Sequence, residues 1–161
     1  MTNKEHLLGH LKTIHGSIKR LIDDISEEEA IVCLPGNPNH IKFLVGHIST
    51  TAAFALTVAG AKPDCPGEWM KLFARGAQVS ADISVYPPID EIRSRLYTLH
   101  AALEEFVAKS DEAALDKVNA IRPGWDENAM DGVLFFCAHD FYHAGQIALI
   151  RHALGRERMF G

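Results

Sequence analysis

The chain has 161 residues, of which 47% are hydrophobic and 23% charged, and its formal net charge is −5. This length suffices to bury a core, and we expect one domain over residues 1–161. The composition is that of a globular protein and excludes a largely disordered chain. A net negative charge without a long basic run argues against nucleic acid as a partner.

The three cysteines, Cys33, Cys65 and Cys137, are odd in number and show no C-x-x-C spacing. This pattern predicts no disulfide framework and is typical of a reducing cytoplasm. The N-terminus lacks the apolar core of a signal peptide, and no window approaches the roughly 18 apolar residues of a membrane span. The sequence therefore predicts a soluble cytoplasmic protein that does not associate with membranes.

Apolar residues near the N-terminus alternate spacings of four and three, which predicts a first helix opened by a capping box of Thr2 and Glu5. Asn37 and Pro38 suit the N-cap and the first position of a second helix that runs to about residue 59. Small residues along one edge, Gly46 among them, would let a neighbouring helix approach closely. The inward stripe expected for this second helix is His40, Phe43, Leu44, His47, Thr51, Phe54 and Val58.

Residues 62–88 lose the helical period and are rich in proline, which predicts a long connection with a short helix at about residues 68–75. Pro87 and Pro88 then open a third helix whose apolar seam extends from Ile89 to Phe106. A further short helix to Val118 and a turn over residues 121–125 are expected to follow. No run of strand alternation is convincing.

The last predicted helix begins near Asp126 or Asn128 and ends at Leu154, with Gly155 as its C-terminal cap. Cys137 falls opposite the expected inward stripe of this helix and is interpreted as a packing residue. That stripe is Gly132, Phe135, Phe136, His139, His143, Gln146, Ile147, Ile150 and Leu154.

Amphipathic helices bury their apolar stripes best against one another, so the sequence predicts an all-α four-helix bundle with a long connection between its second and third helices. That connection indicates a topology other than simple up-down-up-down. Bundles of this kind build metal sites in their cores from side chains on facing helices.

His139 and His143 are four residues apart, which places their Cβ atoms about 6 Å apart on one side of the last helix. Two imidazoles in an apolar stripe need partners, which are either separate hydrogen bonds or a shared cation. His47 lies at the middle of the second helix's stripe and completes a candidate ligand set. Of the other histidines, we expect His15, His100 and His152 to be solvated, and the pair His6 and His10 to lie beside the first helix's seam.

Three imidazole ligands leave coordination positions open for water or substrate, as in catalytic metal sites. The expected cofactor is one divalent ion, with Zn or Ni preferred and Fe or Mn as alternatives. Gln146 and Tyr142, on the same helix, are candidates for orienting a ligand or substrate. The alternatives are an interhelical hydrogen bond for Gln146 and simple packing for Tyr142.

The motif His139-x-x-Tyr142-His143-x-Gly145-Gln146, followed by Arg151 and Leu154-Gly155 and preceded by Gly46-His47, resembles the DinB-like superfamily of small four-helix metalloproteins. The resemblance implies a divalent metal held by His47, His139 and His143. It also implies a stress-associated bacterial protein, a homodimer, and a reaction of a low-molecular-weight thiol such as bacillithiol, mycothiol or glutathione. Asp140 stands where many relatives carry a Glu, which puts a proton-carrying role at this position in doubt.

The leading functional hypothesis is a metal-dependent thiol S-transferase acting on a small-molecule thiol and an electrophilic substrate. The alternative is a non-catalytic metal-binding protein of the stress response or of protein interactions. A site sealed by Phe43, Phe54, Phe135 and Phe136 would favour that alternative. A zinc-protease interpretation ranks last, because the Glu that acts as the base in H-E-x-x-H is absent.

Overall fold

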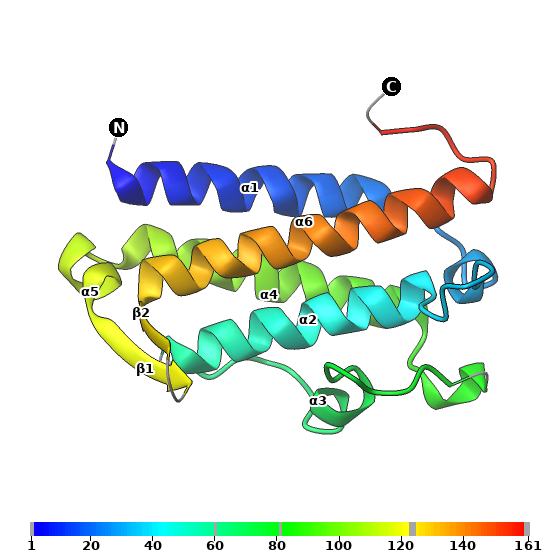
Figure 1. Cartoon of the computed structure of the whole chain (residues 1–161), viewed down its shortest axis with the longest axis horizontal. Coiled ribbons are helices and arrows are strands. Elements are labelled where there is room, and N and C mark those ends of the chain that lie inside the picture. The colour runs from blue at the N-terminus through cyan, green and yellow to red at the C-terminus, as the bar shows by residue number, and fades with distance from the viewer. Residues whose placement is uncertain (1, 60, 81, 123–124, 160–161) are drawn as a thin grey trace.

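The structure, a computed structural model, describes residues 2–59, 61–80, 82–122 and 125–159. Four long helices lie side by side: α1 (Asn3–Ile22), α2 (Ile41–Val58), α4 (Ile89–Lys109) and α6 (Ala129–Ala153), as Figure 1 shows. This arrangement confirms the predicted all-α four-helix bundle. The shorter elements are η1 (Glu29–Ile31), α3 (Trp69–Leu72), η2 (Ile83–Val85), α5 (Glu112–Asp116), β1 (Val118–Arg122) and β2 (Trp125–Asn128).

The direction of the helices follows from the long connection between α2 and α4. α1 and α6 run in one direction, and α2 and α4 run in the other (Figure 1). α2 packs against α4 and α6, and α1 packs against the same two helices. The bundle is therefore up-down-down-up, because the segment that carries α3 and η2 returns the chain to the end of the bundle at which α2 began.

Helix ends follow the sequence signals at most of the predicted positions, including Pro88 as the N-cap of α4. Thr2 and Glu5 form the capping box of α1, Asn128 caps α6 by accepting a hydrogen bond from the backbone of Asp131, and Gly155 has φ 80° after α6. The N-cap of α2 was predicted wrongly. His40 is the cap, and its Nδ1 accepts from the Phe43 backbone N–H at 3.0 Å. Asn37 instead forms an isolated bridge with Leu34.

A short hairpin precedes α6 where the sequence predicted only a turn. β1 and β2 pair in an antiparallel register that sets Val118 opposite Asn128. Pro123 and Gly124 of the predicted turn lie outside the described residues. Neither segment, Val-Asn-Ala-Ile-Arg or Trp-Asp-Glu-Asn, alternates apolar and polar residues, so the sequence carries no strand signal there.

α6 buries part of the predicted stripe and a neighbouring face that was not predicted. His143, Ile147 and Ile150 of the stripe are buried, but so are Cys137 and Asp140, whereas Phe135 of the stripe is 40% exposed. α6 packs on α1 as well as on α2. A helix that contacts two neighbours buries a wider arc than one stripe, so the histidines lie at the edge of the buried face that is turned towards α2.

Two helices within the described residues, α2 and α6, are long and apolar enough to cross a membrane by length and composition alone. The expectation that no window would approach a membrane span was therefore wrong. The apolar window of α2 is 72% buried inside the bundle, as in a core helix, and that of α6 is 39% buried. This test by itself is weak evidence for a membrane span.

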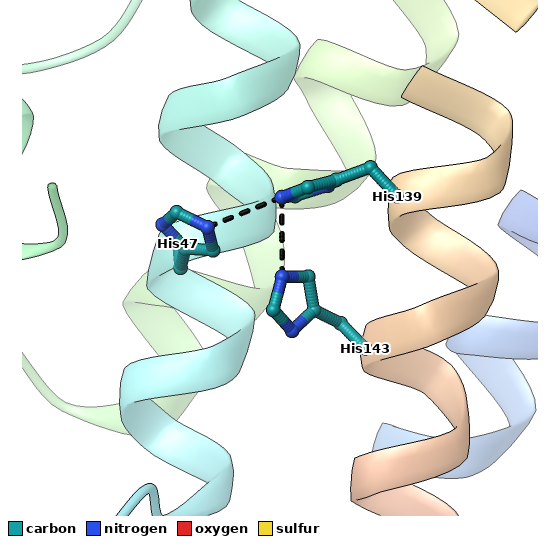
Figure 2. Close-up of side chains that lie close together, drawn as sticks. All are labelled: His47, His139 and His143. Carbon is teal, nitrogen blue, oxygen red and sulfur yellow. Dashed lines mark hydrogen bonds between the residues drawn. The ribbon is translucent and has the colours of Figure 1, made fainter. Parts of the chain in front are cut away.

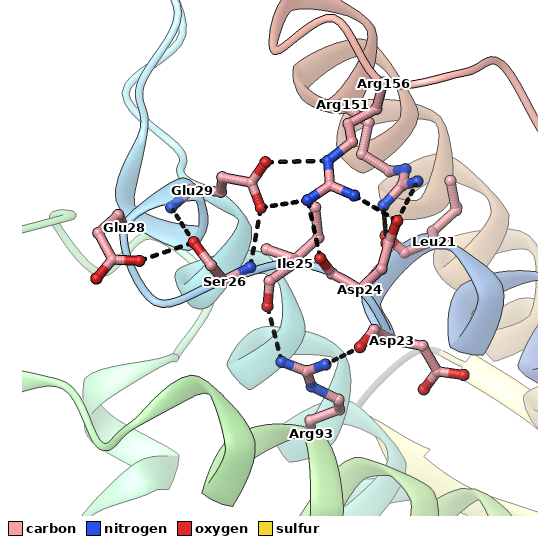
Figure 3. A network of polar contacts seen from close by, with 10 residues as sticks. All are labelled: Leu21, Asp23, Asp24, Ile25, Ser26, Glu28, Glu29, Arg93, Arg151 and Arg156. Carbon is pink, nitrogen blue, oxygen red and sulfur yellow. Dashed lines mark hydrogen bonds and ion pairs between the residues drawn. The ribbon is translucent and has the colours of Figure 1, made fainter.

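An arginine network, which consists of Arg151, Arg156, Asp24 and Glu29, joins the end of α6 to the segment after α1 (Figure 3). Arg151 donates to the buried carbonyl oxygen of Leu21 at 2.8 Å and pairs with Asp24. Arg156 donates from Nε and Nη2 to the two carboxylate oxygens of Glu29 at 3.0 and 2.7 Å. Each guanidinium in this network thus meets carboxylate or carbonyl oxygens.

Candidate metal centre

The three predicted histidines converge between α2 and α6 (Figure 2). Nε2 of His139 lies 3.1 Å from Nε2 of His47 and 3.1 Å from Nε2 of His143. One ligating atom from each of the three rings lies within 4.8 Å of the others. Ligands at about 2.0–2.1 Å from one tetrahedral ion are about 3.3–3.4 Å apart, so the spacing of the nitrogens is close to that of ligands on a shared metal.

Each of the three rings is oriented by an acceptor at its other nitrogen. Nδ1 of His47 lies 2.7 Å from the carbonyl oxygen of Phe73, and Nδ1 of His143 lies 2.7 Å from Oε1 of Gln146. Nδ1 of His139 lies 3.1 Å from Oδ1 of Asp140. Carbonyl and carboxylate oxygens only accept, so each Nδ1 carries the proton and donates.

Because the Nδ1 atoms carry the protons, the three Nε2 atoms present lone pairs to one another. Unprotonated nitrogens at 3.1 Å repel and cannot hydrogen-bond, whereas a cation between them satisfies all three at once. Metal-bound histidines in proteins usually donate their second N–H to a carbonyl or carboxylate in this way. The donor set therefore fits a divalent ion.

The local environment keeps the imidazoles neutral, as metal ligation requires. Burial lowers the pKa of His143 from 6.5 to about 4, although the hydrogen bond with Gln146 acts in the opposite direction. Burial also lowers the pKa of His47, against the effect of its bond to the Phe73 carbonyl. At neutral pH these two rings therefore need no proton removed before a metal binds.

The centre is partly open to solvent. The side chain of His139 is 17% exposed, and His47 is half-buried. Phe43 is buried, with its ring 6.2 Å from that of His47, but Phe54 is 38% exposed and Phe135 is 40% exposed. The aromatic seal that would have favoured a closed site is therefore incomplete.

Gly46 is needed beside His47 because of a close approach from the connection after α2. A Cβ at this position would lie 2.3 Å from the ring of Phe73, which is fully buried. The small-residue edge of α2 thus admits an aromatic side chain here, where the sequence predicted a neighbouring helix. The same Phe73 supplies the carbonyl that orients His47, so the glycine indirectly positions one of the three converging histidines.

Gln146 and Tyr142 occupy the positions that the sequence singled out beside the histidines. Gln146 bonds to His143 within α6, so the predicted alternative of an interhelical hydrogen bond is wrong. Its amide nitrogen also donates to the Tyr142 hydroxyl at 3.4 Å. The ring of Tyr142 contacts that of His143 edge-on, with centroids 5.0 Å apart, as the packing alternative predicted. Because Tyr142 is also 65% exposed, a ligand could reach it.

Sequence reasoning missed a buried polar layer behind the centre. His15 and His100 were expected to be solvated but are 6% and 4% exposed, and their rings stack with centroids 3.6 Å apart. Asp140 is 5% exposed and contacts both His139 and His100. Their burial could have been predicted from their neighbours, because His15 follows Ile14 and His100 follows Leu99 in the apolar seams of their helices. His6, His10 and His152 are exposed.

The cysteines offer no activated thiol near the centre. Cys137 is buried, and burial raises the pKa of its thiol to about 12, in agreement with a packing role. Cys65 is half-buried, and burial also raises the pKa of its thiol, so this thiol is not activated. Cys33 is exposed and free.

A helical bundle with imidazoles that converge from two facing helices is typical of small metal-binding bundle proteins. Comparison with known families identifies the family to which the chain belongs. The DinB superfamily matches residues 10–147, and the chain therefore belongs to that superfamily, which is typically metal-binding. The matched range includes Gly46-His47 and the histidine motif but ends before Arg151. No curated protein matches the chain.

Proposed function

We propose that this protein is a metal-dependent enzyme that transfers a low-molecular-weight thiol, of the bacillithiol, mycothiol or glutathione type, to an electrophilic substrate. His47, His139 and His143 would hold one divalent ion, Zn or Ni in preference to Fe or Mn. The observation that carries the proposal is the convergence of three Nε2 atoms whose rings are each oriented through Nδ1.

Three neutral ligands leave the full charge of a divalent ion in place and leave coordination positions free. When bound by His47, His139 and His143, such an ion would lower the pKa of a thiol so that it ionises near neutral pH. In the transfer, the thiol sulfur forms a bond to the electrophilic carbon, and the leaving group departs with its electron pair. The thiol proton passes to solvent through the open side of the centre, where the His139 side chain is 17% exposed.

The residues around the centre have separate roles in this proposal. Gln146 orients His143, and Tyr142 contacts the incoming thiol or electrophile at the exposed rim. Asp140 is no base for the substrate, because its buried carboxylate is directed at His139 and His100. This placement agrees with the doubt raised by the shorter side chain at that position.

The alternative function, a non-catalytic metal-binding protein of the stress response, has one observation in its favour. Two hollows on the described surface, one lined by residues such as Leu56 and Phe106 and the other by Leu21 and Arg151, do not include His47, His139 or His143. In this alternative, a partly exposed metal ion would serve as a structural or sensing site.

Partners and location complete the proposal. The exposed apolar side chains of α6, among them Leu134, Phe141 and Leu149, support association of two copies into a homodimer. Free cysteines are consistent with a cytoplasmic location. Neither nucleic acid nor a membrane enters the proposed reaction. Light scattering after size-exclusion chromatography measures the oligomeric state, and a monomer at micromolar concentration contradicts the dimer.

The test begins with metal content, measured by mass spectrometry on untagged protein, beside His143→Ala and the surface control His152→Ala. Cobalt-substituted protein is then mixed with each thiol, and a sulfur-to-cobalt charge-transfer band reports direct binding. Consumption of the thiol with a chromogenic aryl halide measures transfer. Thiol binding and transfer that are lost in His143→Ala and kept in His152→Ala support the enzyme. Metal without thiol binding overturns it in favour of the non-catalytic alternative.

A further inference from the structure

A second group of metal-ligating side chains lies buried where α1, α4 and α6 meet. His15, His100 and Asp140 come from these three helices and are 6%, 4% and 5% exposed. A ligating atom from each lies within 4.8 Å of the others. None of the three belongs to the three-histidine centre between α2 and α6. Polar atoms therefore gather at a point in the interior that apolar side chains would otherwise fill.

The hydrogen bonding of this cluster is incomplete. Nε2 of His100 is buried and makes no hydrogen bond with any residue that the structure describes. It faces Oδ2 of Asp140 at 3.6 Å, which is too long for a hydrogen bond. Two ligands bound at 2.0–2.2 Å to one tetrahedral ion stand about 3.3–3.6 Å apart. The separation therefore fits two ligands of a shared ion better than a donor and its acceptor.

His15 is oriented as a metal-binding histidine would be. Its Nδ1 lies 2.7 Å from Oε1 of Glu104, so this carboxylate accepts from Nδ1 and leaves Nε2 of the ring for an ion. The His15 and His100 rings stack at 3.6 Å with an interplanar angle of 8°. Parallel rings direct their in-plane lone pairs side by side, so binding of one ion by both requires the two rings to rotate out of this stack.

The cluster buries a carboxylate among imidazoles. Asp140 is 5% exposed, and its two oxygens lie 3.1 Å from Nδ1 of His139 and 3.6 Å from Nε2 of His100. A buried carboxylate is costly unless a positive group pairs with it, so a divalent cation at this point would stabilise the cluster.

We propose that His15, His100 and Asp140 form a second divalent-cation site, with Glu104 orienting His15. Two imidazole nitrogens with one carboxylate suit first-row ions such as Zn²⁺, Co²⁺ or Fe²⁺. Asp140 links the two sites, because its Oδ1 contacts Nδ1 of His139 at 3.1 Å while its Oδ2 faces His100. An ion on Asp140 therefore changes how strongly His139 is held for the three-histidine centre.

The experiment is a titration of metal-free, untagged protein with Co²⁺, followed by its visible absorption and checked by mass spectrometry of the Zn²⁺-loaded form. Four proteins are compared with the wild type: His47→Ala, His100→Phe, the double variant, and His6→Phe as a surface-histidine control. Phenylalanine keeps the ring stack on His15 and removes only the nitrogens. We expect two equivalents of ion in the wild type and in His6→Phe, one in each of the other single variants, and none in the double variant.

The two sites fail in different ways. One equivalent that is lost in His47→Ala and kept in His100→Phe overturns the second site and leaves the three-histidine centre intact. One equivalent that is kept in His47→Ala and lost in His100→Phe supports the second site and removes the metal basis of the proposed enzyme. Loss of an equivalent in His6→Phe assigns that ion to the surface and overturns the second site.

Folding of each variant is checked by far-ultraviolet circular dichroism. If His100→Phe does not fold, His15→Phe replaces it, because the two rings stack on each other. If neither variant folds, the wild type and His47→Ala still decide. A single equivalent in the wild type together with none in His47→Ala overturns the proposal, whereas one ion retained by His47→Ala supports it.

Discussion

The three-histidine centre and the arginine network are both polar clusters that join distant parts of the chain, but their hydrogen bonding differs. In the arginine network, guanidinium donors face carboxylate and carbonyl oxygens, as Figure 3 shows. In the histidine centre, three Nε2 acceptors face one another (Figure 2). A cluster whose donors meet acceptors is complete as a structural tie. Three facing acceptors can be satisfied only by a cation. The two clusters therefore differ in whether the protein alone provides all their partners.

The largest expected effect comes from removing one of the facing acceptors. Zn²⁺ at about 100 times its Kd should stabilise the wild type by about 2.7 kcal/mol, which raises the Tm by about 5–10 °C. His143→Ala should remove the part of this shift that arises at the three-histidine centre and leave only the part from the second site, because two imidazoles hold the ion far more weakly than three. Differential scanning fluorimetry with and without Zn²⁺ measures the shift. An equal shift in the variant would show that the ion binds elsewhere.

As the pH falls, the buried histidines should lower the free energy of unfolding before the arginine network does. Burial lowers the pKa values of His15, His40 and His143 from 6.5 to about 4. Between these values the unfolded chain binds more protons than the folded one, so stability is complete above pH 6.5 and falls as the pH drops towards 4. Each such histidine contributes a slope of up to about 1.4 kcal/mol per pH unit.

Urea unfolding of the metal-free protein at several pH values measures that slope. The Asp24 pKa is lowered, chiefly by its hydrogen bond with Arg151, so the arginine network stays ionised over the same range. His40→Asn is the matched control, because asparagine can also cap α2 and does not titrate. This variant should reduce the slope by about one histidine's share. A flat profile from pH 6.5 to 4.5 would contradict the buried neutral histidines.

Removing an orienting acceptor should have an intermediate effect. Gln146→Leu deletes the oxygen that receives the Nδ1 proton of His143. Outer partners of metal ligands typically contribute 10–100-fold in metal affinity, and we expect a Zn²⁺ affinity weakened by about that factor. Competition with a chromogenic chelator measures it. Leu149→Gln, an exposed change on the same helix, is the control, and equal affinities of the two variants would refute the role of Gln146.

Gly46→Ala should disturb the centre through its neighbour. The added Cβ would collide with the buried ring of Phe73, whose carbonyl orients His47. Overpacking of this kind costs about 1–3 kcal/mol of unfolding free energy. We expect a weaker Zn²⁺ affinity together with the loss of stability. Gly16→Ala is the matched control, because its Cβ would meet no atom within 4 Å.

The smallest effect is expected from the arginine network, and it should leave the metal untouched. Arg151→Met removes the hydrogen bond to the Leu21 carbonyl and one of the two arginines on Asp24. Because Arg156 still pairs with Asp24, we expect a loss of about 1–2 kcal/mol in unfolding free energy. Zn²⁺ affinity should be unchanged. A drop in affinity comparable to that of Gln146→Leu would show that the two clusters are coupled.

The sequence predicted the helices well where local chemistry determines them. The seam from Leu7 to Leu21, the capping box at Thr2 and the stop at Gly155 all rest on interactions within a few residues. The spacing of His139 and His143 belongs to the same category, because one helical turn relates them. Membership of the DinB superfamily followed from the motif around these residues.

The tertiary structure decided which faces meet. α6 packs against both α1 and α2, so Asp140 is buried and Phe135 is exposed, contrary to the prediction of a single inward stripe. His15 and His100 are far apart in the sequence, and no local spacing predicts that their rings stack. Local interactions are encoded within a few residues and can be read from them. Contacts between helices depend on how all four pack at once, and for that reason only the folded bundle revealed the buried layer behind the histidines.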